Sequence, residues 1–106
     1  MRILLDECVP RGLKRSFGRE HVVQTVPEAG YGGYSNGELL RRIVGRFDLF
    51  LTIDKSIQFQ QNLPKYEIAF VLLRVRSNDI ADVEPLMPRF FARLAEVTSG
   101  KLLVME

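Results

Sequence analysis

The sequence predicts an α/β fold, a three-layer α/β/α sandwich with a mostly parallel sheet of about five strands. Short runs of Ile, Leu, Val and Phe flanked by polar residues recur along the chain, as is typical of strands buried on both faces. Segments with apolar residues at helical spacing separate these runs. Because β-α-β crossovers are right-handed, this alternation places helices on both faces of a parallel sheet.

The length of the chain, 106 residues, suits one domain with one core, so we predict a single domain over residues 1–106. Hydrophobic residues make up 46% of the chain and charged residues 26%, which excludes the disordered and collagen-like classes. The formal net charge of +2 permits contact with a polyanion without requiring it.

The single cysteine, Cys8, has no partner for an internal disulfide and belongs to no Cys-x-x-Cys zinc motif. We interpret it as a small packed side chain rather than a nucleophile. Between Arg2 and Asp6 the chain has only three apolar residues, so we expect neither a signal peptide nor a membrane span there. These features predict a protein of the reducing cytoplasm that does not contact a membrane.

Five segments have the composition of strands. Each is short and rich in aliphatic, β-branched or aromatic residues, and polar residues or turn formers bound it. In chain order the predicted strands are residues 2–5, 21–26, 48–53, 68–75 and 101–105.

Helical patterns occupy the first two connections. The segment 10–17 begins with Pro10, which is favourable at the first position of a helix, and predicts a short helix. The segment 35–47 opens with Ser35 and Glu38 in capping-box spacing and carries an apolar stripe, which predicts a longer helix.

Prolines limit the last two helical segments. Residues 54–64 predict one or two helical turns that close at Pro64, because proline cannot continue a helix. Residues 83–97 place apolar side chains on one side of a helix, and Pro85 and Pro88 are tolerable only in its first turn.

Acidic residues follow two of the predicted strands. Asp6 and Asp54 stand at carboxyl ends, where functional groups gather in open α/β sheets, and neighbouring strands would bring them roughly 5 Å apart. Glu38, from the same edge, is a candidate third carboxylate. Close carboxylates raise one another's pKa unless a hard cation such as Mg²⁺ or Mn²⁺ binds them. This donor set predicts a metal-dependent nuclease that acts on a phosphodiester.

Each acid also has a structural interpretation. Asp54 precedes a predicted helical turn and is a candidate N-cap, while Glu38 fits a capping box that needs no chemistry. Asp6 lies too far from the helix that starts at Pro10 to cap it, which favours a functional role. Glu7 either supports the metal ligands from a neighbouring position or is a solvated turn residue.

Basic and aromatic side chains lie near the same predicted edge. Arg11, Lys14 and Lys55 are candidate contacts for a nucleic-acid backbone, although most basic side chains of the chain fit solvated helix faces. Tyr31 and Tyr34, on a glycine-rich loop, suit either stacking on bases or packing of the loop, and the sequence does not separate these roles.

Three motifs resemble those of a known family: LLDECVP at the start of the chain, SNGELL opening a helix and LFLTIDKS at a strand end. They resemble the small stand-alone PIN-like domains over residues 2–76. That group is similar to toxin ribonucleases of VapBC type, compact α/β/α sandwiches that gather acids around Mg²⁺ or Mn²⁺ and cleave RNA. The resemblance implies that Asp6, Glu38 and Asp54 are the catalytic, metal-binding acids.

Two positions depart from the family pattern. Asn36 stands where relatives usually carry Asp, and Ser56 stands where they often carry a second Asp after the T-x-D acid. Asn36 can still bind a cation through its amide oxygen, and Ser56 through its hydroxyl or a water, but each change removes a negative charge. Glu7, Thr52 and Ser56 are the candidates for residues that surround the metal ligands.

The sequence supports three functional hypotheses. The first is a metal-dependent ribonuclease, the toxin of a toxin–antitoxin pair, whose partners would be RNA and an antitoxin or a second copy of the chain. The second is a catalytically weakened PIN-like module that binds RNA or a protein. The third is a phospho-acceptor domain of receiver type, ranked last because Lys101 precedes the fifth predicted strand instead of following the fourth or fifth.

Overall fold

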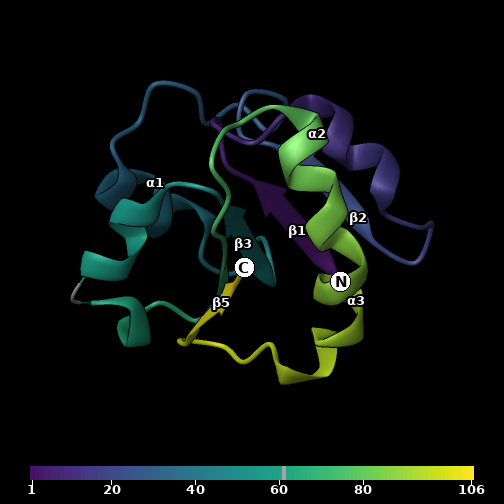
Figure 1. The fold of residues 1–106 in the computed structure, drawn as a ribbon. Coiled ribbons are helices and arrows are strands. Elements are labelled where there is room, and N and C mark those ends of the chain that lie inside the picture. The colour runs from purple at the N-terminus through teal and green to yellow at the C-terminus, as the bar shows by residue number, and fades with distance from the viewer. Residues whose placement is uncertain (61) are drawn as a thin grey trace.

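Five parallel strands form one sheet in the order β2-β1-β3-β4-β5 (Figure 1). The structure is a computed structural model that describes residues 1–60 and 62–106. The strands are β1 (Arg2–Leu5), β2 (Val22–Thr25), β3 (Leu49–Thr52), β4 (Ala69–Leu73) and β5 (Leu102–Met105). The predicted α/β class and the predicted adjacency of the first and third strands are confirmed.

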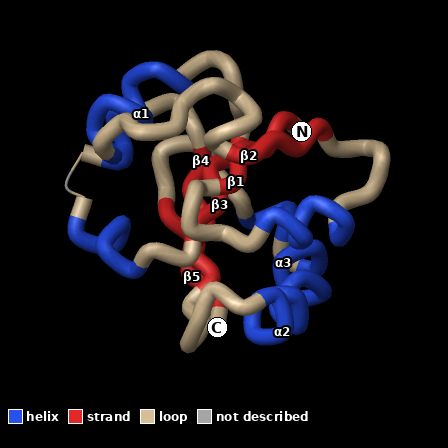
Figure 2. Tube along the Cα trace, turned by 90° about the horizontal axis from the view of Figure 1, so that it is seen from above, coloured by secondary structure: helices blue, strands red, loops and turns tan. Residues whose placement is uncertain are grey.

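Helical segments cover both faces of this sheet. Alternate strand residues such as Ile3 and Leu51 pack on one face against η1 (Arg11–Ser16), α2 (Ile80–Val83) and α3 (Met87–Ala92). Their neighbours, such as Leu4 and Phe50, pack on the other face against α1 (Asn36–Ile43). Seen from above, the strands lie between α1 and the pair α2 and α3 (Figure 2). The β3 and β4 strands are buried along their whole length, as both apolar runs predict.

The first two helices are shorter than their patterns predict. The segment 10–17 forms only the 3₁₀ helix η1, which starts after Pro10. The α1 helix stops at Ile43 instead of 47, and Gly45, with φ of 82°, turns the chain away. Phe47 remains buried although it lies outside the helix.

The predicted helix 83–97 is wrong as one continuous element. It is divided into α2, η4 (Glu84–Leu86), α3 and η5 (Leu94–Glu96). Pro85 and Pro88 stand in the first turn of η4 and of α3, because proline lacks the N–H that an unbroken helix would need at those positions. The apolar stripe survives the breaks, since Met87 and Phe90 are both buried.

The segment predicted to hold one or two helical turns contains η2 (Lys55–Phe59) and η3 (Leu63–Lys65). Pro64 lies inside η3, so the prediction that it closes the helical region is wrong. Gln61, which the prediction also covers, lies outside the described residues. Throughout residues 1–60 and 62–106, no helix combines the length and the apolar character that crossing a membrane requires.

Candidate metal centre at the carboxyl edge

The sheet reverses its winding between β1 and β3, because the chain passes from β1 outward to β2 and then returns to place β3 on the other side. In open α/β sheets ligands bind outside the carboxyl ends of the strands at such a switch point. Asp6 follows β1 there, and Thr52 and Asp54 end β3 and follow it. The two acids predicted from the sequence therefore lie at the expected place.

A small hollow opens at this point. Its volume is about 10 Å³, enough to admit roughly one water molecule or ion. Three apolar side chains from α1, β3 and η2 close its buried side, and four polar residues complete it. The lining residues are Asp6, Asn36, Leu40, Phe50, Thr52, Asp54 and Ile57.

Neutral groups hold the Asp6 carboxylate in place. The backbone N–H of Glu7 donates to its Oδ1 at 2.8 Å, and the Thr52 hydroxyl donates to its Oδ2 at 2.6 Å. No ion pair to Asp6 is formed within the part of the chain that the structure describes. The side chain is thus oriented while its charge has no protein counter-ion.

Thr52 connects the two strand ends. The residue is 1% exposed, and while its hydroxyl donates to Asp6 it also accepts the backbone N–H of Asp54 at 3.0 Å. The Sγ atom of Cys8 lies 3.6 Å from both the Thr52 hydroxyl and Oδ2 of Asp6. Thr52 therefore fixes the position of one acid through its side chain and of the other through its backbone.

Asp54 has a capping role and also faces the hollow. Its Oδ1 accepts the backbone N–H of Ser56 at 2.9 Å, which confirms that it is the N-cap of η2. Its Oδ2 accepts no hydrogen bond from the described residues. One carboxylate oxygen thus stabilises the local turn and the other is available to a ligand.

Glu38 does not line the hollow, whereas Asn36 does. The Glu38 carboxylate pairs with Arg41 and accepts Nε of Arg42 at 2.8 Å, and these two guanidinium groups, Arg41 first, lower its pKa. Positions two apart in an α-helix point about 200° away from each other, so Asn36 and Glu38 cannot both face the same point. In the range 1–60 and 62–106 no three His, Cys, Asp or Glu side chains gather, which corrects the expected convergence of three carboxylates.

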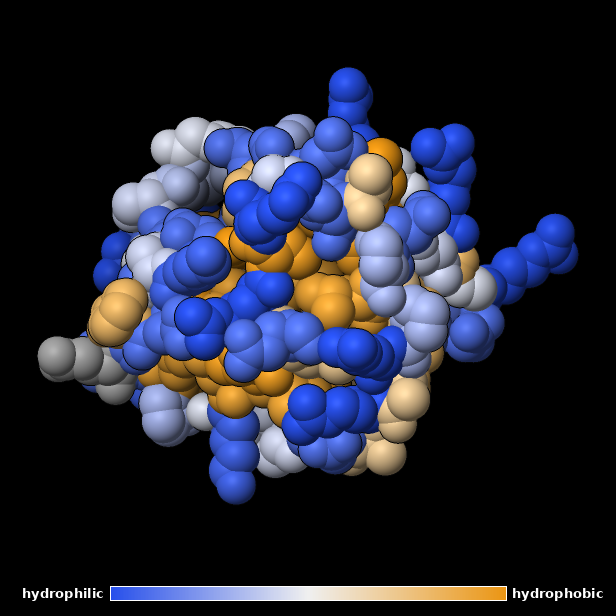
Figure 3. Space-filling view, in the orientation of Figure 1, coloured by the Kyte–Doolittle hydropathy of each residue, from blue (hydrophilic) through white to orange (hydrophobic). Residues whose placement is uncertain are grey.

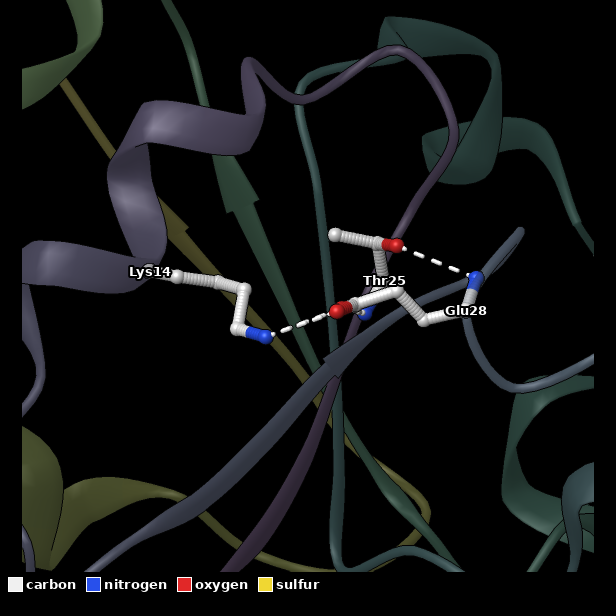
Figure 4. A network of polar contacts seen from close by, with 3 residues as sticks. All are labelled: Lys14, Thr25 and Glu28. Atoms are coloured by element: carbon white, nitrogen blue, oxygen red, sulfur yellow. Dashed lines mark hydrogen bonds and ion pairs between the residues drawn. The ribbon is translucent and has the colours of Figure 1, made fainter.

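Lys14, predicted to contact phosphate, is paired with another residue. Its Nζ lies 3.0 and 2.8 Å from the two Glu28 carboxylate oxygens (Figure 4). The backbone N–H of Thr25 donates to the same carboxylate at 2.8 Å. Hydrogen bonding from Lys14, then from Thr25, lowers the pKa of Glu28 to about 2. The charge of Lys14 is therefore compensated within the protein.

The other residues predicted around the site are more exposed. Arg11, Lys55 and Glu7 are exposed, and the Glu7 carboxylate lies beside the glycine-rich loop, 3.6 Å from where a Cβ at Gly32 would be. Ser56 contributes its backbone N–H to Asp54 rather than a hydroxyl ligand.

Cys8 and Tyr31 pack against their neighbours, whereas Tyr34 is exposed. Burial, followed by the negative charge of Asp6, raises the pKa of the Cys8 thiol, which suits a packed side chain and not a nucleophile. Tyr31 packs edge-on against Phe47, while Tyr34, on the same loop, is exposed with the guanidinium of Arg42 at 4.5 Å from its ring centre.

A wider groove adjoins the hollow and shares Asp54 with it. It runs to the segment after β4 and has a volume of about 410 Å³. Three of its residues, Arg76, Ser77 and Asn78, have no counterpart in the sequence-based prediction. Their signal was their position, because they follow a predicted strand at the same edge as Asp6 and Asp54. The lining residues are Cys8, Ile53, Asp54, Lys55, Val75, Arg76, Ser77 and Asn78.

Comparison of the chain with protein-family models, with curated proteins and with solved structures found no match. The resemblance of the three motifs to PIN-like domains therefore stays a prediction.

Proposed function

We propose that this protein is a metal-dependent ribonuclease that hydrolyses phosphodiester bonds in RNA, with Mg²⁺ or Mn²⁺ bound in the hollow between β1 and β3. One observation carries the proposal. Asp6 and Asp54 line one ion-sized hollow at the switch point of the sheet, and neither has a cationic partner in the described residues.

The residues of the hollow fit such an ion. Carboxylate and amide oxygens are the ligands that Mg²⁺ and Mn²⁺ prefer, and Mg²⁺ commonly uses one or two protein carboxylates and keeps several waters. Asp6 and Asp54 supply the carboxylates and Asn36 the amide. Two carboxylates without a counter-ion repel each other, so a cation would remove a cost that the protein alone leaves in place.

Each residue has a distinct task in this proposal. Asp6 and Asp54 hold the ion, Asn36 adds a neutral oxygen, and Thr52 keeps Asp6 in position. A bound divalent ion supplies stabilisation of negative charge on a phosphate and a lowered pKa of bound water. The resemblance to toxin ribonucleases supports RNA as the substrate and a role as a cytoplasmic toxin.

The proposed protein partner is an antitoxin or a second copy of the chain. Figure 3 shows apolar side chains at the surface in the middle of the face that carries β5. The β5 strand is an edge strand, and its residues Leu102, Leu103 and Val104 are only partly buried. Unpaired edges with apolar flanks are suitable for pairing with another chain.

A second candidate function is a non-catalytic module that binds RNA or a protein. The ion pairs of Glu38 with Arg41 and Arg42 favour it, because they leave the hollow with two carboxylates instead of three. A receiver-type phospho-acceptor has less support. Although the strand order suits it, Lys101 precedes β5 and lies at the amino edge, opposite the hollow.

Cleavage of RNA tests the proposal. Purified protein should degrade single-stranded RNA in Mn²⁺ or Mg²⁺ and lose this activity in EDTA. We expect Asp6→Asn to lower the cleavage rate by roughly a hundredfold or more, because it weakens the ion's hold while keeping the side-chain size. Glu67→Gln is the matched control, since Glu67 is exposed at the amino edge.

Circular dichroism of both variants shows whether the fold is retained. A wild-type protein that never cleaves RNA in either metal would contradict the ribonuclease and favour the non-catalytic module. Full activity of a folded Asp6→Asn variant would also contradict it.

A further inference from the structure

The groove beside the hollow is open to solvent and lies at the carboxyl ends of β3 and β4. Its volume of about 410 Å³ is in the range of pockets that hold one small ligand. Asp54 belongs to both the groove and the hollow, so a chain molecule bound at one continues directly into the other. The apolar wall of the groove consists of Ile53 and Val75.

Two cations on the groove are available to a ligand. Lys55 is exposed and forms no ion pair with the described residues. The Arg76 side chain is 87% exposed and touches Asp82 only through Nε, at 3.4 Å. Asp82 already accepts the Ser77 hydroxyl at 2.6 Å, so this contact is divided between two donors. The outer guanidinium nitrogens of Arg76 remain available for a phosphate.

The opposite side of the hollow, at the end of β2, is different. One of its cations, Lys14, is bound by Glu28, and Glu7 adds an exposed negative charge. A polyanion that crosses the carboxyl edge would meet one cation above β1 that has no ion pair with the described residues, the exposed Arg11, with the acid Glu7 on the same side. Above β3 and β4 it would meet two cations on one groove, Lys55 without an ion pair and Arg76 held only through Nε.

We infer that this groove is a binding site for the backbone of single-stranded RNA, which enters or leaves the hollow over the ends of β3 and β4. The inference rests on the proposed function and names the path of its substrate. Lys55 and Arg76 each contact one of the two phosphates next to the one at the hollow, and Asn78 offers an amide to the same chain. Ile53 and Val75 pack against a sugar or base.

Fluorescence anisotropy with a labelled single-stranded RNA oligomer tests this path in EDTA, where no cleavage occurs. We expect Lys55→Gln/Arg76→Gln to weaken binding by roughly tenfold at moderate salt and to lower the slope of log K against log salt by about 1.4, or about 0.7 per lost phosphate contact. Arg46→Gln/Lys101→Gln is the matched control, because both residues are exposed at the amino edge and its charge change is the same. It should change affinity by less than about twofold.

Equal losses in the two double variants would overturn the inference, because they would show attraction by net charge alone. Unchanged binding by Lys55→Gln/Arg76→Gln, or absence of RNA binding by the wild type, would overturn it too. Cys8 gives a second measurement, since it is the only cysteine and lines the groove. Saturating RNA should slow its alkylation, and an unchanged rate would contradict occupation of the groove.

Mn²⁺ binding separates this inference from the proposed function. If the groove variant binds Mn²⁺ like the wild type but binds RNA equally well, the path is wrong and the ribonuclease stands. If wild-type RNA binding depends on Lys55 and Arg76 but Mn²⁺ does not bind, the path stands and the ribonuclease is wrong.

Discussion

The two edges of the same strand pair, β1 and β3, carry charges in opposite arrangements. At the amino edge Arg2 and Asp48 pair across the strands, with the Arg2 N–H donating at 2.7 Å and its guanidinium at 3.2 Å to the Asp48 carboxylate. At the carboxyl edge the same strands present Asp6 and Asp54, two groups of like charge that line one hollow.

The acids at the two edges differ in whether a cation of the protein compensates them. Hydrogen bonds from the Arg2 backbone and side chain lower the pKa of Asp48, so folding itself accounts for that residue. Asp6 and Asp54 accept hydrogen bonds from neutral groups only, and neither has a cationic partner in the described residues, so the protein leaves both charges uncompensated. Acids without a counter-ion that gather at a switch point are the expected mark of a ligand site.

Adding a third carboxylate to the hollow should increase the charge difference between the two edges most. Asn36→Asp places a negative charge at the first position of α1, where the helix dipole also favours it. We expect Mn²⁺ affinity to rise by roughly tenfold, because ligand charge sets the affinity of such sites. Calorimetric titration measures this, and a fall in affinity would show that Asn36 does not face the ion.

In the absence of metal, removing an acid from the amino edge and removing one from the carboxyl edge should change the free energy of unfolding differently. Asp48→Asn loses its charge-assisted bonds to Arg2 and should lower the free energy of unfolding by about 0.5–1 kcal/mol, as expected for an exposed pair. Asp54→Asn keeps an oxygen for the η2 cap and relieves repulsion, so the free energy should stay equal or rise. Urea unfolding compares the two, and a larger loss for Asp54→Asn would contradict the distinction.

Glu38→Gln should have a smaller effect on the metal than changes in the hollow. Because Glu38 is held by Arg41 and Arg42 outside the hollow, its charge acts only at longer range, and Mn²⁺ affinity should fall by about twofold. A loss as large as that of Asp6→Asn would show that Glu38 leaves its arginines and binds the ion, as the family resemblance implies.

The smallest effect should appear in the acid range. The pKa of Glu28 is about 2 in the folded protein, below its ordinary value of 4.5. Its bonds to Lys14 and Thr25 therefore contribute fully to stability above pH 4.5, and this contribution is lost as the pH falls toward 2. Lys14→Gln should therefore weaken the decline in stability between these pH values. Thermal unfolding at pH 6 and pH 3 measures it, and identical pH dependence in both proteins would contradict this role.

Much of the fold could be predicted because the strands are buried on both faces and read as continuous apolar runs. The helix lengths could not. Apolar spacing over 83–97 indicates which side is buried, but it does not show that Pro85 and Pro88 interrupt the hydrogen bonds of the helix. The side chains Met87 and Phe90 keep their predicted burial in shorter pieces.

The site could be predicted in part, for reasons of geometry. The place of Asp6 and Asp54 could be predicted, because a residue that follows a parallel strand lies at the carboxyl edge of the sheet. Glu38 was misplaced although the sequence held two signals against it. It stands two positions from Asn36, hence about 200° around α1, and three and four positions before Arg41 and Arg42, where helical ion pairs form.

Calorimetric titration of Mn²⁺ into the wild type, Asp54→Asn and Asp48→Asn tests most directly whether the carboxyl edge binds a metal ion. We expect saturable binding near one ion per chain in the wild type and Asp48→Asn, and binding at least roughly tenfold weaker in Asp54→Asn. Absence of binding in the wild type, or equal binding in all three proteins, would contradict a metal centre at the carboxyl edge.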